Sequence, residues 1–344
     1  MKPRLTMKWG IALGLLGLCA VVPLSLFLGS TSVGWRDLMY AAMNPEAESE
    51  RRTLFVLMQL RLPRTLAALL GGAGLALAGC VFQVLLRNPL ATPYTLGVAS
   101  ASAFGAWMGL VVTDLGWFAG GVLGLPTVQV FAFAVALAEI AVIYSLARHR
   151  MRGAPMVLLL TGVTFGMLAN AGIMLTRYLA KPDRLVSMNY WMMGGVDVVG
   201  FAPVVTLCLG VIPCAAVLMG CARQFDQIAF DEEMAESRGV PVVRLQLVGF
   251  FVASIMTAMV VSEIGPIGFV GLVVPHVVRM LVGPYHRALL PCTVLFGGVF
   301  LCACDVVARA LFPGETPIGI MTTLVGGPFF LYLLMQKRYL QWGA

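Results

Sequence analysis

Apolar runs of about twenty residues recur along almost the whole chain, and they restrict its fold more than any other feature. A helix needs about 20 apolar residues to cross a bilayer. Because no water in the hydrocarbon can satisfy backbone groups, such runs are expected to be helical. They lie near residues 10–29, 64–86, 94–113, 117–147, 155–177, 203–221, 241–262, 267–283, 288–311 and 318–336. The sequence therefore predicts an all-α integral membrane protein with roughly ten transmembrane helices.

The composition supports one transmembrane domain that spans residues 1–344. Of the 344 residues, 60% are hydrophobic and only 11% are charged, too few for a soluble protein of this size. The first run, Ile11–Leu28, is longer than the apolar core of a secretory signal and is interpreted as a spanning helix. The run at 267–283 is the weakest, because glycines and prolines interrupt it, and a bend is expected there.

Basic residues set the expected topology. With the N-terminus inside, 14 of the 23 Lys and Arg residues fall on the inner side and nine on the outer side. This bias predicts that both termini are cytoplasmic. The net charge of +7 is then explained by basic residues beside the membrane, and nucleic-acid binding is not expected.

A polar island, Cys221–Arg244, interrupts the apolar runs. Five of the chain's sixteen acids lie in it: Asp226, Asp231, Glu232, Glu233 and Glu236. Helix formers extend over Gln227–Ser237, Gly239 is placed to cap them, and Pro241 blocks continuation. A short charged helix between two spans has too few apolar residues to fold alone. It is therefore predicted to be a contact surface for a soluble partner.

The sequence contains no recognisable catalytic or metal-binding motif. A phosphate-binding G-x-x-x-x-G-K-[ST] loop, a nucleophile elbow and an H-E-x-x-H helix are absent, and the three histidines are scattered. Few ionisable residues fall inside spans: Glu139, which is expected to reach toward the inner surface, Glu263, and Asp305 with Arg309. The last two are spaced i,i+4 and can neutralise each other. An external energy source is therefore expected, and no enzymatic activity.

Several motifs lie in a fixed order along the chain. Among them are Arg61-Leu62-Pro63-Arg64, Arg87-Asn88-Pro89-Leu90-Ala91, Glu232–Val240, GPIGFVGLVVPH from Gly265, DVVARALFP from Asp305 and PIGIMTTLVGGPFFLYLL from Pro317. Together they resemble the FecCD permeases, the membrane subunits of type II ABC importers for iron–siderophore complexes, haem and cobalamin. The resemblance covers essentially residues 10–338. It implies a type II ABC importer permease fold.

The resemblance assigns the island at 222–240 as the coupling segment that docks into a cytoplasmic ATPase. The residues assigned to this contact are Ile228, Phe230, Asp231, Glu232, Glu233, Ala235, Arg238 and Gly239. The alternative is a solvated connecting helix.

The resemblance also implies two further sites. Arg61, Arg64 and Arg309 are expected at the outer mouth, where they meet acids of a periplasmic binding protein, because guanidinium groups bind carboxylates bidentately. Anchoring to lipid headgroups is the alternative. Asn88 and Leu90 are expected near the inner gate of the pathway that the cargo takes through the membrane, and Gln83 is expected to line that pathway. A second gate segment would fall near Ala154–Pro155, where alanine and proline replace the expected small hydroxyl residues.

The expected assembly comprises two permease subunits, with a homodimer favoured, a cytoplasmic ATPase dimer and a periplasmic binding protein in a bacterial inner membrane. No cofactor is expected in this chain, since ATP and Mg belong to the ATPase. Ferric siderophore is the first choice of cargo because it is the commonest in the family, and haem and cobalamin stay open. A self-contained secondary transporter and a membrane enzyme or anchor are the alternatives from other classes.

Overall fold

The computed structural model describes residues 5–28, 43, 48–114, 116–117, 121, 125–150, 155–311 and 316–335. Ten apolar helices dominate this part of the chain. They are α1 (Met7–Phe27), α4 (Leu62–Leu85), α5 (Val98–Asp114), α6 (Thr127–Arg150), α7 (Pro155–Leu179), α9 (Ala202–Gly220), α12 (Val242–Ile264), α13 (Val270–Val282), α14 (His286–Leu311) and α15 (Ile318–Met335).

These helices confirm the spans expected from the sequence. Within the described residues, six of the apolar segments are long enough to cross a membrane and four more are shorter. The largest difference is at the start of α6, ten residues later than expected. The chain is thus a multi-pass membrane protein.

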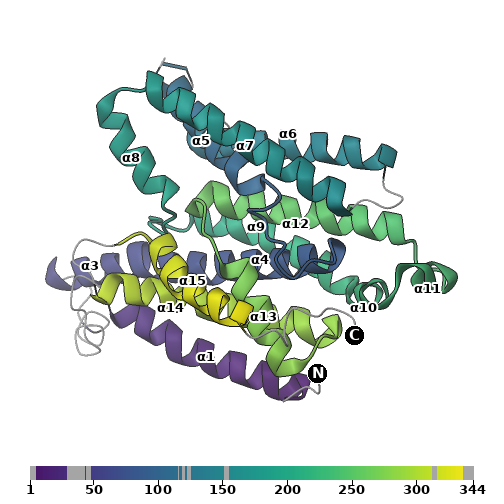
Figure 1. Ribbon diagram of the computed structural model, residues 1–344. Helices are drawn as coiled ribbons and strands as arrows, with labels where there is room; N and C mark the ends of the chain where they lie inside the picture. Colours follow the sequence, from purple (N-terminus) through teal and green to yellow (C-terminus); the bar gives the residue numbers. More distant parts are fainter. Residues whose placement is uncertain are drawn as a thin grey trace.

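Five further elements of the described residues are short. They are α3 (Glu48–Phe55), a π-helical turn η1 (Val56–Arg61), α8 (Pro182–Met192), α10 (Ala222–Phe230) and α11 (Glu232–Ser237). The sequence did not predict α3, η1 or α8, and it predicted a single helix where α10 and α11 lie. Figure 1 shows α10 and α11 at one end of the long helices and α3 and α8 at the opposite end.

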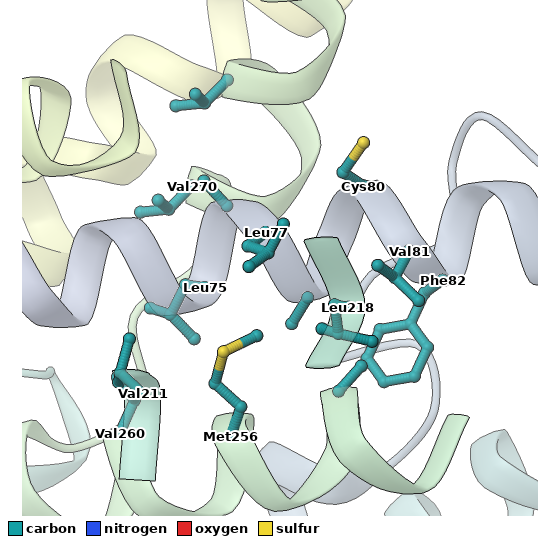
Figure 2. Close-up of a cluster of buried hydrophobic side chains, with 14 of the residues drawn as sticks. Leu75, Leu77, Cys80, Val81, Phe82, Val211, Leu218, Met256, Val260 and Val270 are labelled. Atoms are coloured by element: carbon teal, nitrogen blue, oxygen red, sulfur yellow. The ribbon is translucent and has the colours of Figure 1, made fainter. Parts of the chain in front are cut away.

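Helix α4 forms the centre of the packing. It contacts α9, α12, α13 and α14, and every residue from Gly71 to Leu85 is buried. Figure 2 shows its apolar side chains between those of neighbouring helices, with Leu75 near Met256 of α12 and Val211 of α9. Because α4 is buried on all sides, its sequence is apolar around the whole helix and has no polar face.

Small residues allow the neighbouring backbones to approach α4 closely. A Cβ at Gly72 would overlap the carbonyl oxygen of Gly297 on α14, and one at Gly79 would overlap the carbonyl oxygen of Gly271 on α13. Close backbone approach through small residues is the usual packing device between membrane helices. Gly72 and Gly79 of α4 thus serve close helix packing.

The expected interruption between α12 and α13 is present. Gly265 has φ +70°, and Phe269, which precedes α13, has φ +66°. The left-handed backbone region ends the helical path, so α13 is short and packs against α4 in a new direction. This bend places the 265–269 segment beside α8 and α15, where it forms part of a cavity described below.

Candidate functional site

Arg61 and the C-terminal end of α1 form the first part of a buried polar cluster. The Arg61 side chain is 5% exposed. Its Nη1 donates to the carbonyl oxygens of Leu26 at 2.7 Å and Phe27 at 3.1 Å. A cation at a helix C-terminus satisfies carbonyls that have no partner within the helix. Arg61 therefore ties the start of α4 to the end of α1.

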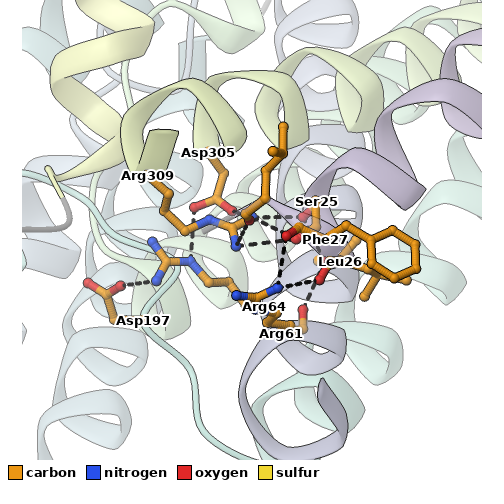
Figure 3. Close-up of polar contacts among 10 residues, drawn as sticks. Ser25, Leu26, Phe27, Arg61, Arg64, Asp197, Asp305 and Arg309 are labelled. Carbon is orange, nitrogen blue, oxygen red and sulfur yellow. Dashed lines mark hydrogen bonds and ion pairs between the residues drawn. The ribbon is translucent and has the colours of Figure 1, made fainter. Parts of the chain in front are cut away.

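Asp305 on α14 forms the second part, between two guanidinium groups. Its side chain is fully buried, with Oδ1 2.9 Å from Arg64 Nε and Oδ2 2.7 Å from Arg309 Nη2. Arg64 also pairs through Nη1 with Asp197 at 3.0 Å. Figure 3 shows these side chains converging from α1, α4, α14 and the segment after α8.

Arg309 completes the cluster by reaching α1. Its Nη2 donates to Ser25 Oγ at 2.8 Å, and its Nη1 donates to the Leu28 carbonyl oxygen at 3.2 Å. Ser25 Oγ lies 2.8 Å from Thr65 Oγ1 of α4. We call Arg61, Arg64, Asp197, Asp305 and Arg309 the arginine cluster.

The structure thus places the three arginines expected at an outer rim inside the molecule. It confirms the Asp305–Arg309 pairing that their spacing predicted. Asp197 was missed, because it lies 133 positions after Arg64 and no local pattern links the two. Docking of a binding protein by these arginines stays a prediction, and such docking would have to compete with the internal carboxylates and carbonyls.

The coupling segment is two helices with a break at Asp231. Asp231 has an extended backbone (φ −162°, ψ 131°) and caps α11, since its Oδ1 accepts from Met234 N at 2.7 Å. Gly239, with φ +83°, ends α11: its N–H donates to Glu236 O and the next N–H, of Val240, donates to Ala235 O. This pair of bonds is the Schellman cap. The single helix expected over Gln227–Ser237 is corrected accordingly, while the Gly239 cap is confirmed.

The two faces of the coupling segment differ. Ile228 and Ala235 are buried against the rest of the protein, whereas Phe230 is 78% exposed. Asp231, Glu233, Arg238 and Gly239 are also exposed, and Glu232 is half-buried. The segment therefore presents one large aromatic ring surrounded by mostly acidic groups.

The 86–97 segment connects α4 to α5 beside the coupling segment. Asn88 Oδ1 accepts from Leu90 N at 2.9 Å, which makes the turn rigid. Leu90 lines a large cavity. The gating contribution of Asn88 and Leu90 stays a prediction, and Ala154 of the expected second gate lies outside the described residues.

Gln83, which was expected to line the pathway, is fully buried between α4 and α13. Its part in the pathway stays a prediction. Its Oε1 accepts from Arg279 Nη2 at 2.9 Å, and its Nε2 donates to the Gly271 carbonyl oxygen at 3.4 Å. The partner arginine lies 196 positions away, which explains why the sequence did not reveal this contact.

Two acidic side chains of the apolar helices, Glu139 and Glu263, are also buried, and Glu263 accepts a hydrogen bond. Glu139 was expected to reach toward the inner surface; it is instead buried against Gly97, because the 86–97 segment and α5 cover α6 at that point. Glu263 Oε2 accepts from Gln129 Nε2 at 2.9 Å. Among the described residues, no three His, Cys, Asp or Glu side chains gather as a metal site.

The cavity has a volume of about 860 Å³. Residues from α5, α7, α15, the 86–97 segment and the 265–269 segment form its wall; Leu90, Tyr94, Asn170, Met193, Phe269 and Phe330 are among them. None of the described residues that line it carries a charged side chain. The Tyr94 phenol in the 86–97 segment adds a neutral polar group to the wall.

The ten apolar helices, the uncharged cavity and the exposed segment at one end define a multi-pass membrane transport subunit. Residues 17–336 match the sequence profile of the FecCD transport family, which is nearly the whole of the 344-residue chain. The chain therefore belongs to the FecCD transport family, and it is an ABC importer permease.

Relatives with different cargoes match most of the chain. The cobalamin import system permease protein of Halobacterium salinarum is 40% identical over 287 residues, 81% of this chain and 73% of that protein. The molybdate import system permease protein of Haemophilus influenzae is 33% identical over 326 residues, 94% of each chain. The hemin transport system permease protein of Yersinia pestis is 32% identical over 325 residues, 94% of this chain and 96% of that protein.

A solved structure has the same fold. An inward-facing structure described as a metal-chelate type ABC transporter superposes with a TM-score of 0.81 at 30% identity, covering 96% of this chain and 100% of that one. This likeness confirms the expected type II ABC importer permease fold.

Proposed function

We propose that this chain is the translocation subunit of an ATP-driven importer that carries a metal chelate across a bacterial inner membrane. It works as one of two permease copies, with a cytoplasmic ATPase dimer that binds ATP and Mg and a periplasmic binding protein. Both termini are cytoplasmic in this proposal, because the basic residues favour the side that carries α10 and α11.

One observation carries the proposal: the coupling segment exposes Phe230 beside acidic groups while Ile228 holds the segment to the membrane domain. A largely exposed aromatic ring on a soluble segment is typical of a protein contact. ATP binding draws the ATPase subunits together and displaces α10 and α11. This motion changes access to the cavity between the two membrane faces.

The cavity favours a bulky cargo with little charge. Its volume of about 860 Å³ suits a large chelate, and its described lining offers apolar and neutral polar groups. Ferric siderophore is the proposed cargo, with cobalamin and haem as alternatives that two of the relatives name. Molybdate fits less well, since a small dianion is held best by cationic or multiple N–H groups.

The experiment is uptake into proteoliposomes that contain the permease, its ATPase and its binding protein. Four probes are offered separately: a hydroxamate siderophore loaded with iron-55, cobalamin labelled with cobalt-57, haem, and molybdate labelled with molybdenum-99. Each is tested with and without ATP inside the proteoliposomes. We expect ATP-dependent uptake of the siderophore. Uptake by the permease alone, without ATP or partners, would identify a secondary transporter and overturn the proposal. ATP-dependent uptake of another probe would overturn only the choice of cargo.

A further inference from the structure

Arg87 occupies a backbone position that normally favours glycine. It follows the end of α4 with φ +47°; its N–H donates to Val84 O at 3.3 Å, and the next N–H, of Asn88, donates to Gln83 O at 3.1 Å. This is the Schellman cap, in which glycine has no steric penalty. The same cap at the end of α11 does use glycine, Gly239. An arginine at the α4 cap therefore suggests a role for its side chain.

The Arg87 side chain reaches both helices of the coupling segment. Its Nε lies 3.3 Å from Glu232 Oε1 on α11, and its Nη2 donates to the Ile228 carbonyl oxygen on α10 at 3.4 Å. Glu232 Oε1 also accepts from Gln246 Nε2 on α12 at 3.0 Å. One guanidinium group thus bridges the break at Asp231 from the membrane domain.

The backbone of Arg87 leads directly to the cavity. Asn88 follows it, and the bond from Leu90 N to Asn88 Oδ1 stiffens the turn. Leu90 is part of the cavity wall. Only two residues, Asn88 and Pro89, therefore separate Arg87, which contacts the coupling segment, from Leu90 in the cavity wall.

We propose that Arg87 is a positioning residue that transmits the displacement of α10 and α11 to the 88–90 turn, through its ion pair with Glu232. The proposal rests on the proposed function, because it requires that an ATPase moves the coupling segment. A capping role alone, in which the charge merely satisfies the Ile228 carbonyl, would stabilise α10 but transmit nothing.

The test uses hydrogen exchange in the assembled transporter, which needs no cargo. Exchange of the amides of 86–97 and of 222–240 is measured with and without trapping of the ATPases by ATP and vanadate. The variants are Arg87→Gly, which suits the left-handed backbone, and Glu232→Gln. Arg244→Ala, at an exposed arginine of α12, is the matched control. The double variant Arg87→Glu with Glu232→Arg, called the swap, restores an ion pair in which the two charges have exchanged positions.

In the unsubstituted transporter and in Arg244→Ala, both segments are expected to change exchange on trapping. In Arg87→Gly and Glu232→Gln the change at 222–240 persists, while the change at 86–97 falls roughly fivefold or more, and the swap recovers part of it. An undiminished change at 86–97 in Arg87→Gly overturns the proposal. If 222–240 does not respond in the unsubstituted transporter, the proposed function fails instead.

Discussion

The arginine cluster and the coupling segment are two polar regions of this membrane protein, and they are built in opposite ways. In the arginine cluster the charges face inward, and Asp305 is fully buried between Arg64 and Arg309. In the coupling segment most acidic groups and Phe230 face outward. The first region joins helices of this chain, whereas we propose that the second offers its surface to another protein.

The difference predicts where substitutions affect folding and where they affect assembly. Removing one partner of a buried ion pair leaves a charge without compensation in a poor solvent. Exposed charges are solvated in both states, so their loss changes the free energy of unfolding little. Equal losses in the free energy of unfolding for substitutions in the two regions would contradict this comparison.

Asp305→Asn is expected to have the largest effect. It leaves Arg64 and Arg309 without their shared carboxylate, so we expect the free energy of unfolding to fall by about 3–5 kcal/mol. Chemical unfolding of the permease in detergent micelles measures this loss. Asp197→Asn is the control, because its side chain is 36% exposed, and it should cost less than about 1 kcal/mol. Equal losses for both would show that burial does not govern the cluster.

The next effect separates the two faces of the coupling segment. Ile228→Ala removes a side chain that is 1% exposed, and we expect a loss of about 2–5 kcal/mol in the free energy of unfolding. Phe230→Ala removes a larger but exposed side chain and should change it by about 0.5 kcal/mol or less. The same unfolding assay measures both variants. A large loss for Phe230→Ala would mean that its ring packs within the permease.

A smaller effect tests the helix that connects the two regions. Gly79→Ala puts a methyl group against the Gly271 carbonyl oxygen, so α4 and α13 must separate. We expect a cost of about 1–3 kcal/mol, measured as a lower midpoint of thermal unfolding. Gly220→Ala is the control, since nothing lies within 4 Å of an added Cβ there. A midpoint unchanged by Gly79→Ala would refute close packing at this site.

Local patterns in the sequence predicted much of the fold. The apolar runs located the membrane helices because helix length and composition are fixed by the bilayer. The glycines and prolines after Ile264 likewise predicted the break before α13. The break at Asp231 was missed, although a capping aspartate three residues before Met234 was visible, because the surrounding helix formers masked it.

Long-range pairing could not be predicted in the same way. The partners of Arg64 and Gln83 lie far along the chain, at Asp197, Asp305 and Arg279. Their contacts depend on how the helices pack, which a single sequence does not encode in any local period. The i,i+4 spacing of Asp305 and Arg309 was a local pattern and predicted their pair, whereas the contacts of Arg61, Arg64 and Gln83 with distant segments were not predicted.

The most direct test of the central claim, that ATP-driven motion enters through α10 and α11, is the affinity of the purified ATPase for the permease. The ATPase is titrated onto the unsubstituted permease and onto Phe230→Ala in detergent micelles. We expect about 30-fold weaker binding for the variant, as for an interface hot spot worth about 2 kcal/mol, at an unchanged midpoint of unfolding. Equal affinity for both would contradict the account.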